Sequence, residues 1–140
     1  MLIVKQSCEW IQKPIFPLSV IELAGRTCYK SEDKITEDSS KKFVKMILDR
    51  GHESVIEHIS ASIKFITNRG VTHELVRHRL CSFSQESTRY VNYNNSDIQF
   101  IKPVWWSDEI ETMAQKQWIS AMKSCEDSYN ELIKYGWRPE

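Results

Sequence analysis

The chain has 140 residues, of which 41% are hydrophobic and 27% are charged, a composition typical of one globular domain. Its 19 basic and 19 acidic residues cancel, so no overall field favours a nucleic-acid polymer or an anionic membrane surface. No apolar run approaches the ~20 residues that a membrane-spanning helix needs, and Lys5 interrupts the first apolar run before it could serve as a secretory signal. We expect a single domain over residues 1–140, in the cytoplasm, with no membrane or nucleic-acid partner.

The four cysteines lie too far apart for a zinc ribbon or a dense disulfide framework. They are Cys8, Cys28, Cys81 and Cys125. Because an unpaired cysteine behaves as a small hydrophobic residue, we expect free thiols that are mostly buried.

The first quarter of the chain predicts one strand and one helix. Residues 2–8 form a short mixed run that fits an edge strand. Ser19 and Glu22 have the spacing of a capping box, and the apolar residues around them predict a helix that begins at Ser19 and ends near Lys30.

A second amphipathic helix is predicted before Gly51, because four apolar residues recur there at helical spacing. They are Phe43, Val44, Ile47 and Leu48. From Ile59 to Phe65 apolar and polar residues alternate, which predicts a strand with one apolar face.

A long C-terminal helix is predicted, with Ser107 as its cap and Gly136 at its end. Its apolar stripe predicts a position at the centre of the core. The stripe consists of Ile110, Met113, Ala114, Trp118, Ala121, Cys125, Tyr129 and Leu132. Together these elements predict an α+β fold, with helices packed on a small, mostly antiparallel sheet. Because Gly, Pro and Glu after a helix often begin the next one, we expect the natural protein to continue past Glu140.

All four histidines lie within 27 residues, beside several arginines and glutamates. They are His52, His58, His73 and His78. No pair has the one-turn spacing of a helical zinc site, so we expect no metal. The alternative to a functional cluster is a solvated helix face with a few hydrogen-bonded histidines.

Residues 70–80 predict a short helix capped by Thr72, with Arg79 on the flank of its apolar stripe. An unpaired guanidinium would be costly to desolvate there, so we expect Arg79 to have an anionic partner or ligand.

The loop at residues 81–90 is rich in hydroxyls and amides and carries Arg89 near its end. Arginine offers a planar fork to phosphate oxygens, and serine and threonine add neutral donors, so the loop predicts a phosphomonoester site. A nucleophilic Cys81 with a nearby histidine is a second hypothesis, and a packing role for Cys81 is a third.

Two motifs in this region resemble those of one enzyme family. Arg77-His78-Arg79, then seven residues, then Ser87 resembles the signature of flavin-dependent thymidylate synthases. Upstream, Gly51-His52-Glu53-Ser54 followed by Glu57-His58 resembles the G-H-x-S-x-x-E-H element of the same family. The resemblance covers roughly residues 17–136.

This resemblance implies methylation of dUMP to dTMP, with methylenetetrahydrofolate as carbon donor, NADPH as reductant and FAD as hydride carrier. It also implies a homotetramer whose sites draw on several subunits. The family's arginine that activates the uracil ring is expected beyond residue 140. We therefore assign no catalytic residue within the chain and expect the 140-residue chain to be inactive or severely impaired.

The resemblance also implies two sets of binding residues. The expected dUMP contacts are Glu74, Leu75, Val76, Arg77, Gln85, Glu86, Ser87, Thr88 and Arg89. The expected flavin contacts are His52, Ser54, Arg77, His78, Arg79 and Gln85. Gln85 stands where many members have glutamate, and its amide can still accept and donate hydrogen bonds.

Two other functions compete with the enzyme. One is a non-catalytic flavin- or nucleotide-binding module that kept the phosphate loop. The other is an interaction domain with an aromatic surface formed by Trp105, Trp106 and Tyr135.

Overall fold

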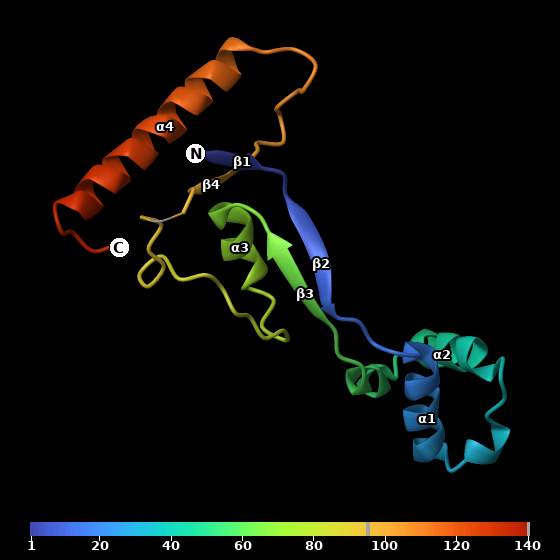
Figure 1. The fold of residues 1–140 in the computed structure, drawn as a ribbon. Helices are drawn as coiled ribbons and strands as arrows, with labels where there is room; N and C mark the ends of the chain where they lie inside the picture. The colour runs from blue at the N-terminus through green and yellow to red at the C-terminus, as the bar shows by residue number, and fades with distance from the viewer. Residues whose placement is uncertain (95, 140) are drawn as a thin grey trace. The chain divides into compact units, whose positions relative to one another are not determined.

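The computed structural model describes residues 1–94 and 96–139, and it confirms the predicted α+β class (Figure 1). The chain divides into two compact units, which we name by their main helices. The α1/α2 unit is Cys8–Lys64, and the α4 unit combines Met1–Ser7 with Phe65–Glu140. The single domain that we expected stays a prediction.

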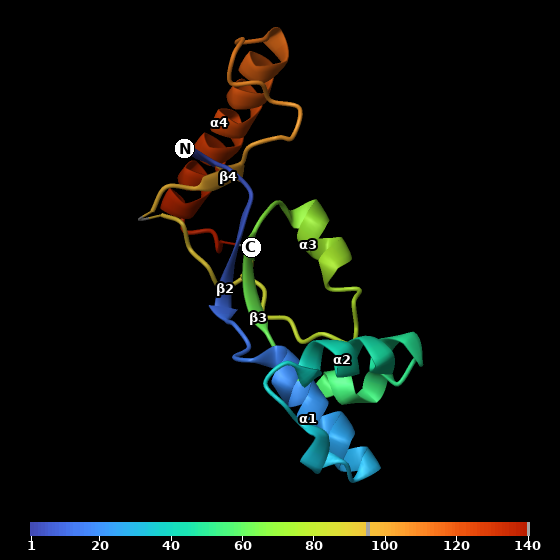
Figure 2. The same ribbon diagram turned by 90° about the vertical axis from the view of Figure 1, so that its right-hand side faces the viewer.

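The α1/α2 unit is mainly helical. It contains α1 (Pro17–Tyr29), the 3₁₀ helix η1 (Glu32–Lys34), α2 (Ser39–Asp49) and the 3₁₀ helix η2 (Glu53–His58). It also contains β2 (Ser7–Gln12) from Cys8 onward and β3 (Ser62–Ile66) up to Lys64. The strands β2 and β3 pair as the small antiparallel sheet that the sequence predicts, although β3 begins later than Ile59. The helices α1 and α2 lie side by side in both ribbon views (Figures 1 and 2).

A buried hydrophobic cluster joins α1, α2 and η2. It consists of Ile21, Phe43, Val44, Ile47 and Val55. Three of these residues have the helical spacing that predicted α2, and full burial of such side chains stabilises a fold by about 1.5–3 kcal/mol each. The fourth predicted residue, Leu48, is 49% exposed.

The end of α2 is as predicted. Gly51 has a positive φ of 69°, and its N–H donates to the carbonyl of Leu48 at 3.0 Å. The N–H of His52 donates to the carbonyl of Ile47 at 3.1 Å, which completes a Schellman motif.

The start of α1 differs from the prediction. The helix begins at Pro17, whose ring presets a helical φ and whose missing N–H would have no helical partner at this position. The capping box at Ser19 and Glu22 does not form. Glu22 is instead 1% exposed and accepts hydrogen bonds from Arg26 at 3.1 and 3.2 Å and from the Ser39 hydroxyl at 2.8 Å. Since a buried carboxylate needs such partners, Glu22 ties α1 to the start of α2.

The α4 unit contains a different small sheet. Its elements are β1 (Leu2–Val4), α3 (Arg69–Leu75), β4 (Gln99–Ile101) and α4 (Met113–Lys134). The strands β1 and β4 pair in parallel, with Ile3 opposite Phe100. The run at residues 2–8, which we expected as one strand, is therefore shared between β1 and the start of β2.

The cap of α4 is Thr112, and the prediction of Ser107 is wrong. The Thr112 hydroxyl accepts from the N–H of Gln115 at 3.2 Å, and the Gln115 side chain accepts in return from the N–H of Thr112. This capping box satisfies two amides at the helix start, whereas the Ser107 hydroxyl accepts from the N–H of Glu109. The helix ends near Gly136, as predicted, at a φ of 84°.

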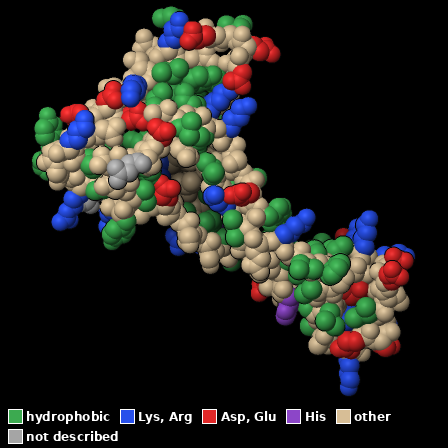
Figure 3. All heavy atoms as spheres, in the orientation of Figure 1, with side chains coloured by type: hydrophobic (Ala, Val, Ile, Leu, Met, Phe, Trp, Pro, Cys, Tyr) green, Lys and Arg blue, Asp and Glu red, His purple; other side chains and the backbone are tan. Residues whose placement is uncertain are grey.

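The prediction that α4 is the centre of the core is wrong for the residues that the structure describes. The buried side chains of α4 are Gln115 and Glu126, whereas Met113 and Leu132 are 71% and 51% exposed. Trp118 meets Phe100 and Trp106 edge to face at ring-centre distances of 6.4 and 5.6 Å. Hydrophobic side chains are accordingly visible on the surface (Figure 3).

All four cysteines are free, as expected, but the prediction that they are mostly buried is wrong, since all are exposed. Cys8 lies on β2, whose side chains are all exposed, and Cys125 lies on the uncovered stripe of α4. In the described part of the chain, no helix is both long enough and apolar enough to cross a membrane.

Candidate functional site

The first motif follows the end of α2, in the α1/α2 unit. The Schellman motif fixes the backbone of His52, and its ring Nδ1 lies 2.9 Å from the hydroxyl of Tyr29 at the end of α1. The other ring nitrogen, Nε2, has no hydrogen-bond partner among residues 1–94 and 96–139. His52 is therefore held from one side and can offer its second nitrogen to a ligand.

The rest of this motif forms η2, which is anchored by one buried side chain. Val55 is 7% exposed and belongs to the hydrophobic cluster, whereas Glu53, Ser54 and Glu57 are exposed. The motif therefore combines an apolar anchor with polar side chains that remain accessible.

The second motif follows α3, in the α4 unit. Asn68 caps this helix by accepting from the N–H of Val71 at 3.0 Å, so the prediction that Thr72 is the cap is wrong. The Thr72 hydroxyl lies inside the helix and donates to the carbonyl of Arg69 at 3.1 Å.

The helix is also shorter than predicted, because it ends at Leu75. The N–H groups of Arg77 and His78 donate three residues back, to Glu74 at 3.0 Å and Leu75 at 3.1 Å, which tightens the last turn. Arg77, His78 and Arg79 therefore lie in turns after α3. Leu75 and Val76 are half-buried at the helix end.

The three residues of the R-H-R motif are exposed. In the described chain, neither Arg77 nor Arg79 has a side-chain hydrogen bond or ion pair, so the anionic partner expected for Arg79 is not one of these residues. Exposed guanidinium groups remain hydrated and need no internal partner. Both arginines can therefore meet an external anion.

The following loop is attached to the start of α3. Arg69 donates from Nη1 to the backbone carbonyl of Glu86 at 3.1 Å. The side-chain oxygen of Gln85, in the orientation that satisfies its amide, accepts from Arg69 Nε at 3.3 Å and also from Arg69 Nη1. The carboxylate of Glu86 accepts from the Tyr93 hydroxyl.

The last part of the loop forms a turn around Ser87, which is half-buried. Its hydroxyl oxygen accepts from the N–H of Arg89 at 3.2 Å, and its carbonyl accepts from the N–H of Val91 at 3.2 Å. The proton of the Ser87 hydroxyl remains available to an acceptor. The guanidinium of Arg89 lies 5.9 Å from the centre of the Tyr90 ring, and Thr88 is exposed.

Within the α4 unit, the structure thus connects α3 to Gln85 and Glu86 through Arg69. Sequence reasoning missed Arg69, Tyr93 and, in the other unit, Tyr29. None of the three belongs to the quoted motifs, and their partners lie 7 to 23 residues away in sequence.

The metal and thiol hypotheses gain no support from the described residues. No group of three or more potential metal ligands occurs among them. The Cys81 N–H closes a turn with the carbonyl of His78 at 2.9 Å, but the Cys81 thiol has no hydrogen bond to a described histidine.

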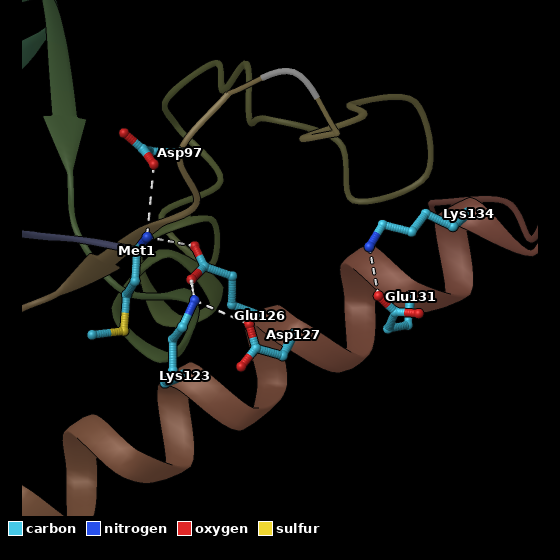
Figure 4. A network of polar contacts seen from close by, with 7 residues as sticks. All are labelled: Met1, Asp97, Lys123, Glu126, Asp127, Glu131 and Lys134. Carbon is cyan, nitrogen blue, oxygen red and sulfur yellow. Dashed lines mark hydrogen bonds and ion pairs between the residues drawn. The ribbon is translucent and has the colours of Figure 1, made fainter.

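Outside the two motifs, an ionic network attaches the start of the chain to α4 and shifts the pKa values of Lys123 and Glu126 (Figure 4). The Met1 ammonium lies 2.7 Å from a carboxylate oxygen of Glu126 and 3.7 Å from Asp97. Lys123 lies 3.0 Å from both Glu126 and Asp127. Hydrogen bonds from the Met1 ammonium and Lys123 lower the pKa of the Glu126 carboxyl, while Asp127 and Glu126 raise the pKa of Lys123.

The fold and the second motif define the class of this protein: an α+β protein with an exposed, arginine-bearing loop whose groups suit a phosphorylated ligand. The model of one family, described as thymidylate synthase complementing protein (Thy1), matches residues 12–140. The chain belongs to this family.

Curated relatives support the assignment. The flavin-dependent thymidylate synthase of Mycobacterium avium is 39% identical over 119 residues, which cover 82% of this chain and 46% of the relative. The proteins of that name from Geobacter sulfurreducens and Pyrococcus abyssi are each 32% identical, over 86% and 89% of this chain and 54% of either relative. The chain spans about half the length of the curated relatives it matches.

Proposed function

We propose that this chain supplies nucleotide- and flavin-binding segments of a flavin-dependent thymidylate synthase. The proposed reaction methylates dUMP to dTMP, with methylenetetrahydrofolate as carbon donor and NADPH as reductant. Membership of the family and the names of the relatives support this function. A cytoplasmic location is part of the same proposal.

The proposal is supported chiefly by the exposure of the arginines in the R-H-R motif and the loop that follows it. Arg77 and Arg89 are exposed, and neither has an ion-pair partner in the described chain. The dUMP phosphate is a dianion that arginine forks and a serine hydroxyl can bind. The proposed dUMP contacts are Glu74, Leu75, Val76, Arg77, Gln85, Glu86, Ser87, Thr88 and Arg89.

The residues present also fit a flavin dinucleotide. FAD carries a pyrophosphate, which suits the exposed cations of the R-H-R motif, and His52 has a ring nitrogen available for a polar group. The proposed FAD contacts are His52, Ser54, Arg77, His78, Arg79 and Gln85. When bound, FAD would supply the hydride chemistry, while these side chains bind and orient it.

The two sets of contacts need not act within one copy of the chain. A homotetramer whose sites combine segments of several subunits is part of the proposal. In such an assembly, His52 of one copy and Arg77 of another could serve the same site.

Titration with FAD and turnover of dUMP together test this function. The purified chain should quench FAD fluorescence on binding, and dUMP should bind with a measurable heat. Tritium release from dUMP labelled at C5, with methylenetetrahydrofolate and NADPH present, would identify the enzyme. Because we expect this chain to be inactive or severely impaired by itself, binding of FAD and dUMP supports the proposal with or without tritium release, and binding of neither ligand would contradict both functions.

A further inference from the structure

Arg69 makes side-chain contacts with two consecutive residues of the proposed dUMP loop. Its guanidinium donates to the Glu86 backbone carbonyl at 3.1 Å and to the side-chain oxygen of Gln85. We propose that Arg69 is a positioning residue that holds residues 85–89 in the conformation that binds dUMP. This inference rests on the proposed function, and nothing in the resemblance assigns a role to Arg69.

Arg69 is well placed to hold the loop because it is the first residue of α3. The Asn68 cap fixes the helix start, so the Arg69 side chain extends to the loop from an ordered backbone. A guanidinium has five donors in one plane, which allows contacts with one main-chain and one side-chain oxygen together. One arginine therefore restrains both the path of the loop and the rotamer of Gln85.

A second anchor holds the same loop from α4. The Tyr93 hydroxyl donates to the Glu86 carboxylate, and the Tyr93 N–H donates to the hydroxyl of Tyr129 at 3.1 Å. The rings of Tyr93 and Tyr129 also meet edge to face, at 6.2 Å. Glu86 is thus connected to α3 through its carbonyl and to α4 through its carboxylate.

The two anchors lie immediately before the turn that carries the phosphate-binding candidates. Ser87 follows Glu86 directly and accepts from the N–H of Arg89. If the anchors are removed, dUMP must order this segment when it binds, and that cost lowers affinity. Arg69 then affects dUMP without contacting it, through a loop that is already ordered in the free protein.

The test compares the variants Arg69→Gln and Arg50→Gln of the 140-residue chain. Both changes remove one exposed arginine charge, but among the described residues the Arg50 side chain makes no hydrogen bond or ion pair, and Arg50 lies in the α1/α2 unit. Amide hydrogen exchange of residues 85–91, measured without ligand, reports loop order. Calorimetry with dUMP reports affinity. Arg69→Gln should speed exchange and raise the dUMP Kd by about tenfold each, and Arg50→Gln should change neither.

A second variant keeps the test decisive if Arg69→Gln fails to fold. Tyr93→Phe removes one hydroxyl and keeps the ring that packs on Tyr129. It should also speed exchange of the Arg89 and Val91 amides, which donate to Ser87. Arg69→Lys, which keeps the charge but not the planar fork, should restore only part of the affinity.

Different results overturn the two claims. Unchanged exchange in Arg69→Gln and Tyr93→Phe would overturn the positioning role. Arg89→Ala serves as a positive control for weaker dUMP binding. If Arg89→Ala weakens dUMP binding but Arg69→Gln shows faster exchange with unchanged dUMP affinity, the link between loop order and affinity is overturned. A wild-type chain that fails to bind dUMP would refute the proposed function, and with it the role of Arg69 toward dUMP.

Discussion

The hydroxyl of Tyr29 lies at hydrogen-bond distance, 2.9 Å, from Nδ1 of His52. Tyr29 is the last residue of α1, and His52 follows the glycine turn that ends α2. The buried cluster and Glu22 hold these two helices together, so the packing of α1 on α2 sets the orientation of His52. One ring nitrogen is thereby occupied, and the other is left for the proposed flavin.

Tyr29→Phe should weaken FAD binding by about three- to tenfold, because a neutral hydrogen bond of this kind contributes about 0.5–1.5 kcal/mol. The nitrogen chemical shifts of His52 should change as well, since its tautomer loses its fixed partner. Fluorescence titration with FAD and NMR of the imidazole measure both effects. Tyr135→Phe removes an exposed hydroxyl from the end of α4 and should leave both unchanged. Equal losses in the two variants would contradict this role for Tyr29.

Gly25→Ala should destabilise the α1/α2 unit. A Cβ at this buried position would lie 2.5 Å from Cε1 and 2.9 Å from Cζ of Phe43. Overpacking of this kind costs about 1–3 kcal/mol, which exceeds the gain of about 1 kcal/mol from the better helix propensity of alanine. Urea unfolding measures the difference. In a Phe43→Leu background the cost should shrink, and an equal cost there would show that Phe43 is not the cause.

Glu126→Gln should lower the Tm at neutral pH and have less effect in acid. Folding lowers the pKa of Glu126, so its contribution to stability is present above the unfolded pKa and is lost as the pH falls through the lower folded pKa. The melting curves of variant and wild type should therefore converge as the pH is lowered. Glu131→Gln breaks an exposed pair with Lys134 and should cost less than Glu126→Gln at neutral pH. A pH-independent difference for Glu126→Gln would contradict the ionic role.

Several features of the fold could be predicted because they depend on neighbouring residues. Gly51 and Gly136 end helices through positive φ angles and short backbone contacts, and the alternation before Phe65 predicts a strand. The apolar spacing of Phe43, Val44 and Ile47 correctly indicated the buried face of α2.

Other features depend on residues far apart in sequence. The parallel pairing of Ile3 with Phe100 cannot be read from either segment alone. The cap of α4 was predicted wrongly for a different reason. Ser107 and Thr112 are both good cap residues, but only Thr112 has a glutamine, Gln115, three positions later to complete a capping box. Cys125 is exposed because it lies on the uncovered apolar stripe of α4. Helical periodicity identifies such a stripe but does not show whether another element covers it.

The sequence indicates the motif residues of the candidate site, but it does not indicate the residues that hold those motifs in place. His52, Arg77 and Ser87 stand at motif spacings, whereas Tyr29 and Arg69 act through single long-range contacts that leave no periodic signal.

Calorimetric titration of dUMP into the wild type, Arg77→Ala, Arg89→Ala and the control Arg50→Ala measures whether these guanidinium groups bind the dUMP phosphate. Removing a guanidinium that binds the phosphate should cost about 2 kcal/mol, or roughly 30-fold in Kd, because the charge loses a hydrogen-bonded partner. We predict this loss in Arg77→Ala and Arg89→Ala and unchanged affinity in Arg50→Ala. Equal dUMP affinity in all four proteins would contradict the account.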